Sequence, residues 1–394
     1  MGNLGIVVIG YNRLNNLERI LNRLNKCYYG KDKVTLIISL DNSGMKSLAE
    51  FAKKFKWLHG EKYIKTFPER LGLRKHVFTC GNYLNEFDLE AISVFEDDIF
   101  PSSGFYNYMK QSIKYYKDDD RIAGISLYKH MWNVNANAPF ETLYNSDSDV
   151  YFMQFAQSWG QIWMRKQWND FYQWYLKNDT FIDNYLIPET VSNWPETSWL
   201  KYHVKYCIEN EKFFVYPYHS LTTCFSEEGE HAVAKSTTFQ VPLEQSFKKA
   251  YKFQPLDKNA VAYDAFFESL NISNSLKVDN GNLIVDLYGT KRKFLRGSYV
   301  LSTRTLNEPI IKTYGLELKP MEMNVSYDIE GHNIFLYHIS SDRLQNRNES
   351  ELLKWIYFHR TLPNWKTLLQ IVKFKIKFLT KLITKKGILT KIKF

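Results

Sequence analysis

Hydrophobic and polar residues alternate in two distinct patterns over the first 130 positions. Short apolar runs such as LGIVVIGY (residues 4–11) and AISVF (91–95) predict buried β-strands. The segments between them repeat apolar residues at helical spacing, and the first of these helices places on one face Leu14, Leu17, Ile20, Leu21 and Leu24. Strands that alternate with amphipathic helices predict an α/β fold built on a parallel sheet.

The pattern divides the chain into three parts. Predicted strands lie at residues 4–11, 33–44, 63–67, 91–95 and 121–128, with predicted helices at 12–26, 45–55, 73–87 and 103–117. A less regular, Trp- and Pro-rich stretch follows, and short strands such as GNLIVDLYGT (281–290) and SYVLSTR (298–304) come later. We predict an α/β domain over 1–235, a smaller β-containing region over 236–345 and a basic amphipathic helical tail over 346–394.

Charge is concentrated in the tail. The net charge is +10, but Leu352–Phe394 carry 11 Lys and Arg and no acid, so the first 351 residues sum to −1. A nucleic-acid-binding body would be basic, and this one is not. The mixture of lysines with Leu, Ile and Phe over 366–394 predicts attachment to an anionic membrane surface. A solvated charged tail or a helix that docks on a partner is the alternative.

The cysteines and the N-terminus predict a reducing compartment. Cys27, Cys80, Cys207 and Cys224 form no CxxC pair, which argues against a zinc site and a disulfide framework. The first residues read as a strand rather than a secretory signal, and no apolar run has the length of a transmembrane helix. We expect a cytoplasmic protein that is peripherally attached to the inner face of the cell membrane.

Polar residues follow each of the first four predicted strands. In open parallel sheets, ligands bind beyond the carboxyl ends of the strands, so these residues are candidates for one site. They are Gly10, Tyr11, Asn12 and Arg13, then Asp41 and Asn42, then Arg70 and Gly72, and finally Glu96, Asp97 and Asp98. Each group alone is also ordinary turn chemistry, but four successive strand ends of this kind favour a binding site.

The three consecutive acids at 96–98 lie between apolar flanks. Carboxylates suit Mg²⁺ or Mn²⁺, and a divalent cation would favour their ionised forms despite mutual repulsion. Capping of the next helix by Asp98 or Ser102 would use one acid and leave two without a role. The chain contains neither GxxxxGK[ST] nor GxGxxG. A metal–diphosphate site without a P-loop is the interpretation that remains.

The chain resembles the GT-A glycosyltransferases, specifically the N-acetylglucosaminyltransferase I type and the broader family 2 transferases. The motifs that carry the resemblance are VVIGYNR, SLDNSG, FPERLGLRKHVF, VFEDDIFPSSGFYNY, QSWGQIWMRKQW and NWPETSWLKYHVKY, within about residues 4–235. The resemblance implies a Rossmann-like nucleotide-sugar-binding domain and a divalent metal, Mn²⁺ or Mg²⁺. It also implies a nucleotide-sugar donor, most often a UDP-sugar, and a glycan or lipid-linked acceptor in bacterial polysaccharide assembly.

The resemblance also implies roles for individual residues. Asp98 would bind the metal, Asp97 the ribose or a water of the metal, and Glu96 the donor. Asp41 would face the uracil or ribose, with Arg13 and Arg70 at the nucleotide end. His231 would lie near the metal or the diphosphate. Trp159 and Gly160 would form the wall of the sugar pocket. Trp163 and Trp168 read instead as core residues.

The catalytic base is the point at which the chain departs from the family. Related enzymes place an acid where this chain has Leu200 and Lys201, and the nearest acid is Glu196 in WPETSW. Glu196 is the candidate base, and the alternative is an acid that stabilises a helix N-terminus. Inversion at the anomeric carbon is implied by the resemblance alone. A sugar-phosphate nucleotidyltransferase and an inactive glycan-binding or scaffolding protein are the rival interpretations.

Overall fold

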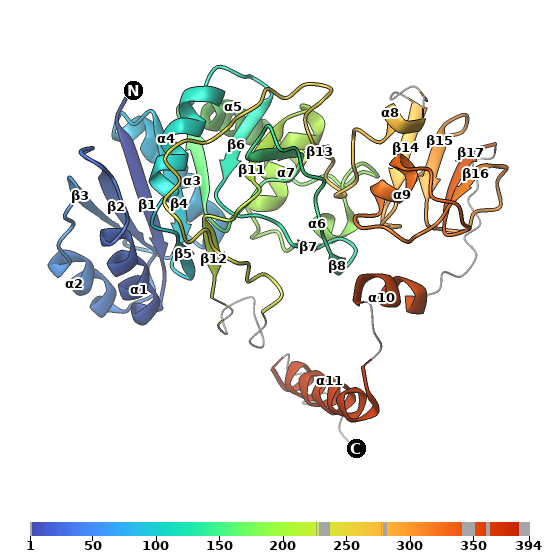
Figure 1. The fold of residues 1–394 in the computed structure, drawn as a ribbon. Helices are drawn as coiled ribbons and strands as arrows, with labels where there is room; N and C mark the ends of the chain where they lie inside the picture. The colour runs from blue at the N-terminus through green and yellow to red at the C-terminus, as the bar shows by residue number, and fades with distance from the viewer. Residues whose placement is uncertain are drawn as a thin grey trace. The chain divides into compact units, whose positions relative to one another are not determined.

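The computed structural model describes residues 2–225, 227, 237–276, 278, 282–340, 351–359 and 363–385. The chain forms two compact units, drawn in Figure 1. The first contains residues 1–225 and 239–347, and the second contains residues 226–238 and 348–394.

A nine-stranded sheet organises the first unit, with the strand order β13-β9-β11-β6-β10-β4-β1-β2-β3 (Figure 1). Its strands are β1 Leu4–Gly10, β2 Thr35–Leu40, β3 Lys62–Thr66, β4 Ala91–Glu96, β6 Ile122–Ser126, β9 Val150–Met153, β10 Gln161–Met164, β11 Phe213–Pro217 and β13 Ala262–Tyr263. The first four strands are parallel, and β10 runs antiparallel between β4 and β6. The α/β class and the predicted alternation of strands and helices are confirmed.

Helices cover both faces of this sheet because side chains alternate along each strand. The long helices of the first unit are α1 Leu14–Asn25, α2 Lys46–Lys54, α3 Leu73–Glu86, α4 Phe105–Tyr116, α5 Arg165–Lys177 and α7 Leu200–Glu209. Ile6 and Val8 of β1 share a core cluster with α1, α2 and α4, whereas Val7 is buried outside that cluster. A second aromatic core joins α3, α5 and α7, where Phe171 stacks on His203 with ring centroids 3.8 Å apart.

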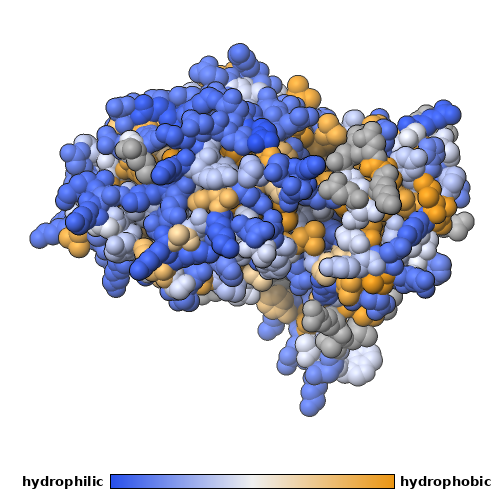
Figure 2. All heavy atoms as spheres, turned by 45° about the horizontal axis from the view of Figure 1, so that its top comes forward, coloured by the Kyte–Doolittle hydropathy of each residue, from blue (hydrophilic) through white to orange (hydrophobic). Residues whose placement is uncertain are grey.

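The predicted core role of two tryptophans is confirmed. Trp163 and Trp168 are both fully buried, and their rings stack with centroids 4.3 Å apart. The α3 backbone approaches Trp168 so closely that only a glycine, Gly81, fits beneath the ring. Hydrophilic side chains cover most of the face drawn in Figure 2, as expected when the large apolar residues are packed inside.

A four-stranded sheet lies later in the first unit, in the order β14-β15-β17-β16. Its strands are β14 Leu283–Asp286, β15 Tyr299–Ser302, β16 Ile310–Tyr314 and β17 Ile334–His338. The predicted strands within 281–290 and 298–304 are therefore present. β13 also comes from the predicted 236–345 region, but it joins the large sheet beside β9. The domain boundary at residue 235 stays a prediction.

Shorter elements complete the first unit. They are β5 Ile99–Pro101 paired with β12 Thr222–Cys224, β7 Trp132–Asn133 paired with β8 Ala138–Pro139, and the short helices α6 Glu189–Ser192, α8 Ser273–Leu276 and α9 Glu322–Ser326. The second unit contains α10 Glu351–His359 and α11 Trp365–Lys385. Among the described residues, no helix combines the length and the apolarity that crossing a bilayer requires.

Candidate functional site

The strand order of the sheet reverses at β1. The chain runs from β1 to β2 and β3 on one side, and β4 then lies on the other side of β1. At such a switch point the loops that leave two neighbouring parallel strands diverge, and a crevice opens between them. Ile9 of β1 is level with Glu96 of β4, so the two strands end together. The sheet therefore brings the loop with Arg13 next to the acid triplet.

Arg13 reaches from the loop after β1 to two of the three acids. Its Nη2 donates to Oδ1 of Asp97 in a close contact and to Oδ2 of Asp98 at 3.3 Å. The Asp97 side chain is buried, whereas those of Arg13 and Asp98 are 28% and 25% exposed. Two sets of residues separated by more than eighty positions in sequence thus meet at one point, as the strand-end pattern predicts.

The acid triplet holds more negative charge than its environment favours. Burial, together with the charges of Asp98 and Asp97, raises the pKa of Glu96 to about 8, although Arg13 opposes the shift. Burial also raises the pKa of Asp97 to about 6, against the lowering effect of Arg13. Because a nearby cation favours ionised carboxylates, the crevice is suited to accept further positive charge.

Asp41 fixes the loop between β3 and α3. Its Oδ1 accepts from the backbone N–H of Leu71 at 2.7 Å, and its Oδ2 accepts from that of Gly72 at 2.9 Å. Gly72 has φ of +76°, a left-handed conformation that favours glycine. The loop holds the Arg70 guanidinium over the ring of Tyr11, 4.7 Å from its centroid. Asp41 therefore positions the predicted nucleotide-end residues, and its own contact with a nucleotide stays a prediction.

Two more predicted residues lie at the start of β10. Because β10 is antiparallel to β4, with Gln161 level with Val94, its first residues lie near the carboxyl end of β4. The carbonyl of Trp159 accepts from Thr222 Oγ1 at 2.6 Å, and Gly160 has φ of +93°. A Cβ at Gly160 would lie only 2.7 Å from Thr222 Cγ2, so the close approach requires glycine. Gly10 and the exposed Asn12 complete the set at the end of β1.

Glu196 precedes α7 and has two side-chain partners that the sequence did not reveal. Its Oε1 accepts from Lys201 Nζ at 2.9 Å, and its Oε2 accepts from the Tyr202 hydroxyl at 3.3 Å. The Tyr202 hydroxyl in turn accepts from Arg74 Nη1 at 2.7 Å, just beyond the loop that Asp41 fixes. Lys201 is buried beneath Glu196. The hydrogen bond from Lys201 lowers the pKa of Glu196, which is 71% exposed.

The acid triplet fits a metal that the substrate helps to bind. No cluster of three or more His, Cys, Asp or Glu that could hold a metal occurs within the described part of the chain. Mg²⁺ commonly takes only one or two carboxylates and completes its shell with water and substrate phosphates. Asp98 and Asp97 would supply such a partial set of ligands. His231, the third predicted ligand, lies outside the described residues.

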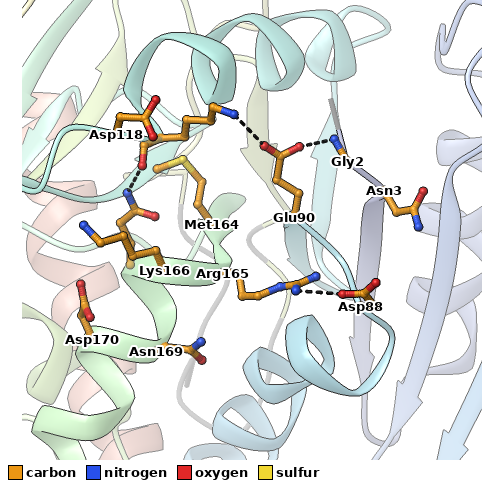
Figure 3. A pocket seen from close by; sticks show the side chains of 12 residues that line it. Gly2, Asn3, Asp88, Glu90, Asp118, Met164, Arg165, Lys166, Asn169 and Asp170 are labelled. Carbon is orange, nitrogen blue, oxygen red and sulfur yellow. Dashed lines mark hydrogen bonds and ion pairs between the residues drawn. The ribbon is translucent and has the colours of Figure 1, made fainter.

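A separate cavity of about 910 Å³ lies at the opposite edge of the sheet (Figure 3). Its lining comes from the start of β1, the residues before β4 and the start of α5. Two ion pairs lie in its lining, Arg165 with Asp88 at 2.8 Å and Lys117 with Glu90 at 3.4 Å. This cavity is therefore remote from the strand ends that carry the candidate chemistry.

Comparison with known proteins gives weak likenesses. No family model matches the chain, and no curated protein matches it. Among solved structures, a Pyrobaculum calidifontis mannosyltransferase with GDP-Man and Mn²⁺ is 14% identical with a TM-score of 0.30, over 42% of this chain and 45% of that one. S. aureus TarS residues 1–349 with UDP-GlcNAc is 16% identical with a TM-score of 0.35, over 59% and 61%. Likenesses this weak say nothing about activity.

The buried imidazole of His76, in α3, predicts that the free energy of unfolding depends on pH. His76 is buried, its Nε2 lies 2.7 Å from Ser39 Oγ, and burial lowers its pKa to about 4. As pH falls, His76 therefore gains a proton in the unfolded chain before it does so in the folded chain. The stability that its neutral imidazole contributes is full above pH 6.5 and is lost as pH falls toward 4. Compared with His76→Gln, the wild type should lose up to about 3 kcal/mol more of its unfolding free energy over this range.

Urea unfolding at several pH values measures this difference, and the exposed His219→Gln variant is the control. Unfolding free energies of wild type and His76→Gln that change in parallel between pH 7 and pH 4 would contradict the prediction.

Proposed function

We propose that the protein is a metal-dependent glycosyltransferase of the GT-A type, which moves a sugar from a nucleotide-sugar to a hydroxyl of a glycan or lipid-linked acceptor. The observation that carries the proposal is the meeting of Arg13 with Asp97 and Asp98 across the crevice between β1 and β4. The carboxylates supply the donor set for a cation, and the crevice lies where nucleotides bind in open α/β sheets. A UDP-sugar is the donor that the sequence resemblance favours.

The residues at the ends of β1 and β4 and in the neighbouring loop would each bind a different part of the donor. Asp98, with Asp97, would hold Mn²⁺ or Mg²⁺, which supplies positive charge to a leaving diphosphate. Arg13 keeps Asp97 ionised against the effect of burial. Tyr11 and Arg70 offer a stacked ring and guanidinium, a surface that suits a nucleotide base. The ordered loop held by Asp41 keeps this surface in place before the donor arrives.

Glu196 is proposed as the base that takes the proton of the acceptor hydroxyl. Its carboxylate is exposed and is held by Lys201 and Tyr202, so it is oriented without being enclosed. Lys201 keeps it ionised, which a base requires, at the expense of its basicity. Attack by the acceptor on the face opposite the diphosphate would invert the anomeric carbon.

The metal assignment predicts the effect of one substitution. Asp98→Ala removes the more exposed carboxylate of the pair, so donor hydrolysis that depends on Mn²⁺ should fall by about 100-fold or more. The assay is release of UDP from the nucleotide-sugar selected by a thermal-shift screen of UDP-, GDP- and dTDP-sugars. Asp170→Ala, an exposed acid at the opposite edge of the sheet, is the matched control. Undiminished hydrolysis by Asp98→Ala would remove the metal assignment. Release of pyrophosphate from a sugar phosphate and a nucleoside triphosphate would instead indicate a nucleotidyltransferase.

The assignment of the base predicts a different kinetic pattern. Glu196→Gln keeps the shape and the contact with Tyr202 but cannot accept a proton, so kcat for transfer should fall by about 10²–10⁴-fold with donor affinity unchanged. Transfer of radiolabelled sugar to an extract of cell-envelope glycans measures kcat, and calorimetry measures donor binding. Glu209→Gln, an α7 glutamate paired with Lys205, is the control. Equal transfer rates for Glu196→Gln and wild type would assign the proton to another group.

We further propose that the tail attaches the enzyme to the inner face of the cell membrane from the cytoplasm. In α11 the rings of Trp365 and Phe374 are 78% and 63% exposed, among lysines at 373, 375 and 377. Apolar side chains beside lysines are the composition that binds anionic lipid surfaces. An acceptor carried on a lipid would then be presented at the same surface.

The triple substitution of Lys373, Lys375 and Lys377 by Gln tests this attachment. Each lysine near an anionic surface contributes about 1 kcal/mol, so binding to vesicles of phosphatidylglycerol and phosphatidylcholine should weaken about 100-fold. Co-sedimentation measures the binding, and the same substitutions at Lys46, Lys53 and Lys54 of α2 are the control. Equal binding of both triple variants, or equal binding of wild type to pure phosphatidylcholine, would refute the attachment.

A further inference from the structure

A second cavity of about 530 Å³ lies beside the segment that leads to Glu196. One wall comes from α6 and its neighbours, residues 188–193, and the other from the turn after β14, residues 289–292. Arg304, which follows β15, and Asn135 also line it. None of these residues belongs to the donor crevice.

The charged lining of this cavity is predominantly positive. Lys291, Arg292 and Arg304 line it together with a single acid, Glu189. Each cation has an acidic partner that does not line the cavity: Asp264 for Lys291, Asp183 for Arg292 and Asp286 for Arg304. The three cations and Glu189 are therefore the charges nearest to a molecule inside.

The cations are fixed before any ligand arrives. Arg292 donates through Nη1 and Nη2 to the two oxygens of Asp183, both at 2.7 Å, and through Nη2 to the carbonyl of Ile187 at 2.6 Å. Arg304 donates through Nε to Asp286 Oδ2 at 2.7 Å and through Nη2 to the carbonyl of Lys291 at 2.8 Å. Side chains held in this way lose little further entropy when a ligand binds.

The lining also carries polar atoms that lack partners. Among the described residues, Arg292 Nε, Thr290 Oγ1 and Asn135 Oδ1 are buried and make no hydrogen bond. Buried polar atoms are normally paired, so three such atoms in residues that line one cavity are an exception. They are closed off from the cavity itself, so a ligand would reach them only after these side chains rotate. Two of the three, the guanidinium and the hydroxyl, can donate.

We propose that this cavity binds a sugar that carries an oxyanion, either a phosphate or a carboxylate. Fixed guanidinium groups beside hydroxyl and amide groups match both an anionic group and the hydroxyls of a sugar. The occupant is a part of the acceptor, and this assignment rests on the proposed function. Arg292 binds Asp183, Asp183 accepts from Ser192 Oγ at 2.5 Å, and the carbonyl of Ser192 accepts from Lys201, the partner of Glu196. The cavity and the candidate base therefore share one continuous set of contacts.

Calorimetry with the full-length protein tests the proposal using three probes: glucose 1-phosphate, glucuronic acid and neutral methyl glucoside. Wild type should bind at least one of the anionic probes, and whichever it binds identifies the oxyanion. Methyl glucoside should bind at least about tenfold more weakly, which corresponds to the loss of one charge-assisted hydrogen bond. Equal affinity for the neutral probe, or no binding of either anion, would overturn the proposal.

Substitutions in the lining test whether the anionic probe binds in this cavity. Arg292→Gln should raise the Kd of the bound anion about tenfold, whereas Lys293→Gln, the same charge change at an exposed neighbour outside the lining, should leave it unchanged. Thr290→Val breaks no ion pair and should raise the Kd about threefold, which keeps the test open if Arg292→Gln fails to fold. An unchanged Kd in Thr290→Val and in folded Arg292→Gln would contradict the site.

A variant at the proposed donor site distinguishes anion binding in this cavity from the proposed transferase function. Arg13→Gln alters only the crevice between β1 and β4, so it should bind the anionic probe like wild type. Loss of probe binding in Arg13→Gln would place the anion in the donor crevice and overturn the inference. Retained binding by a protein that shows no donor hydrolysis would leave the cavity assigned while the transferase proposal fails.

Discussion

The candidate site depends on the repulsion among three carboxylates that a buried strand delivers to one point. Glu96, Asp97 and Asp98 cannot all be ionised at the end of β4 without compensation, and Arg13 supplies only part of it, since the pKa of Glu96 and of Asp97 stays raised. The strand order puts Arg13 opposite the acids because β1 and β4 are neighbours that end together. A site with residual negative charge is prepared for a cation that arrives with its own ligands.

The other site features follow from how the surrounding loops are fixed. Asp41 uses both oxygens on backbone amides, and this orders the loop that carries Arg70. Near the proposed base, a turn of the four-stranded sheet reaches back through Arg292 to the segment before Glu196. The residues proposed to bind donor and acceptor thus come from elements far apart in sequence, and ion pairs and backbone hydrogen bonds hold them in place rather than apolar packing alone.

Sequence patterns predicted the fold well where periodicity was strong. The apolar runs of β1, β2 and β4 and the helical face of α1 were identified because burial on a sheet or on one helix face leaves a direct trace in the order of residues. The return of Ala262–Tyr263 to the large sheet could not be predicted, since a two-residue strand carries no periodicity of its own. The strand-end rule likewise predicted that Arg13 and the acid triplet lie together.

Side-chain partners were beyond prediction. Nothing in WPETSWLKY shows that Lys201 turns beneath Glu196, or that Tyr202 links Glu196 to Arg74.

The most direct test of the metal site is a crystal structure with UDP and Mn²⁺, in which the anomalous signal of manganese locates the ion. We expect the ion about 2.1 Å from a carboxylate oxygen of Asp98, with the diphosphate beside Arg13. Manganese or diphosphate bound elsewhere, with Arg13 still closed over the acids, would contradict it.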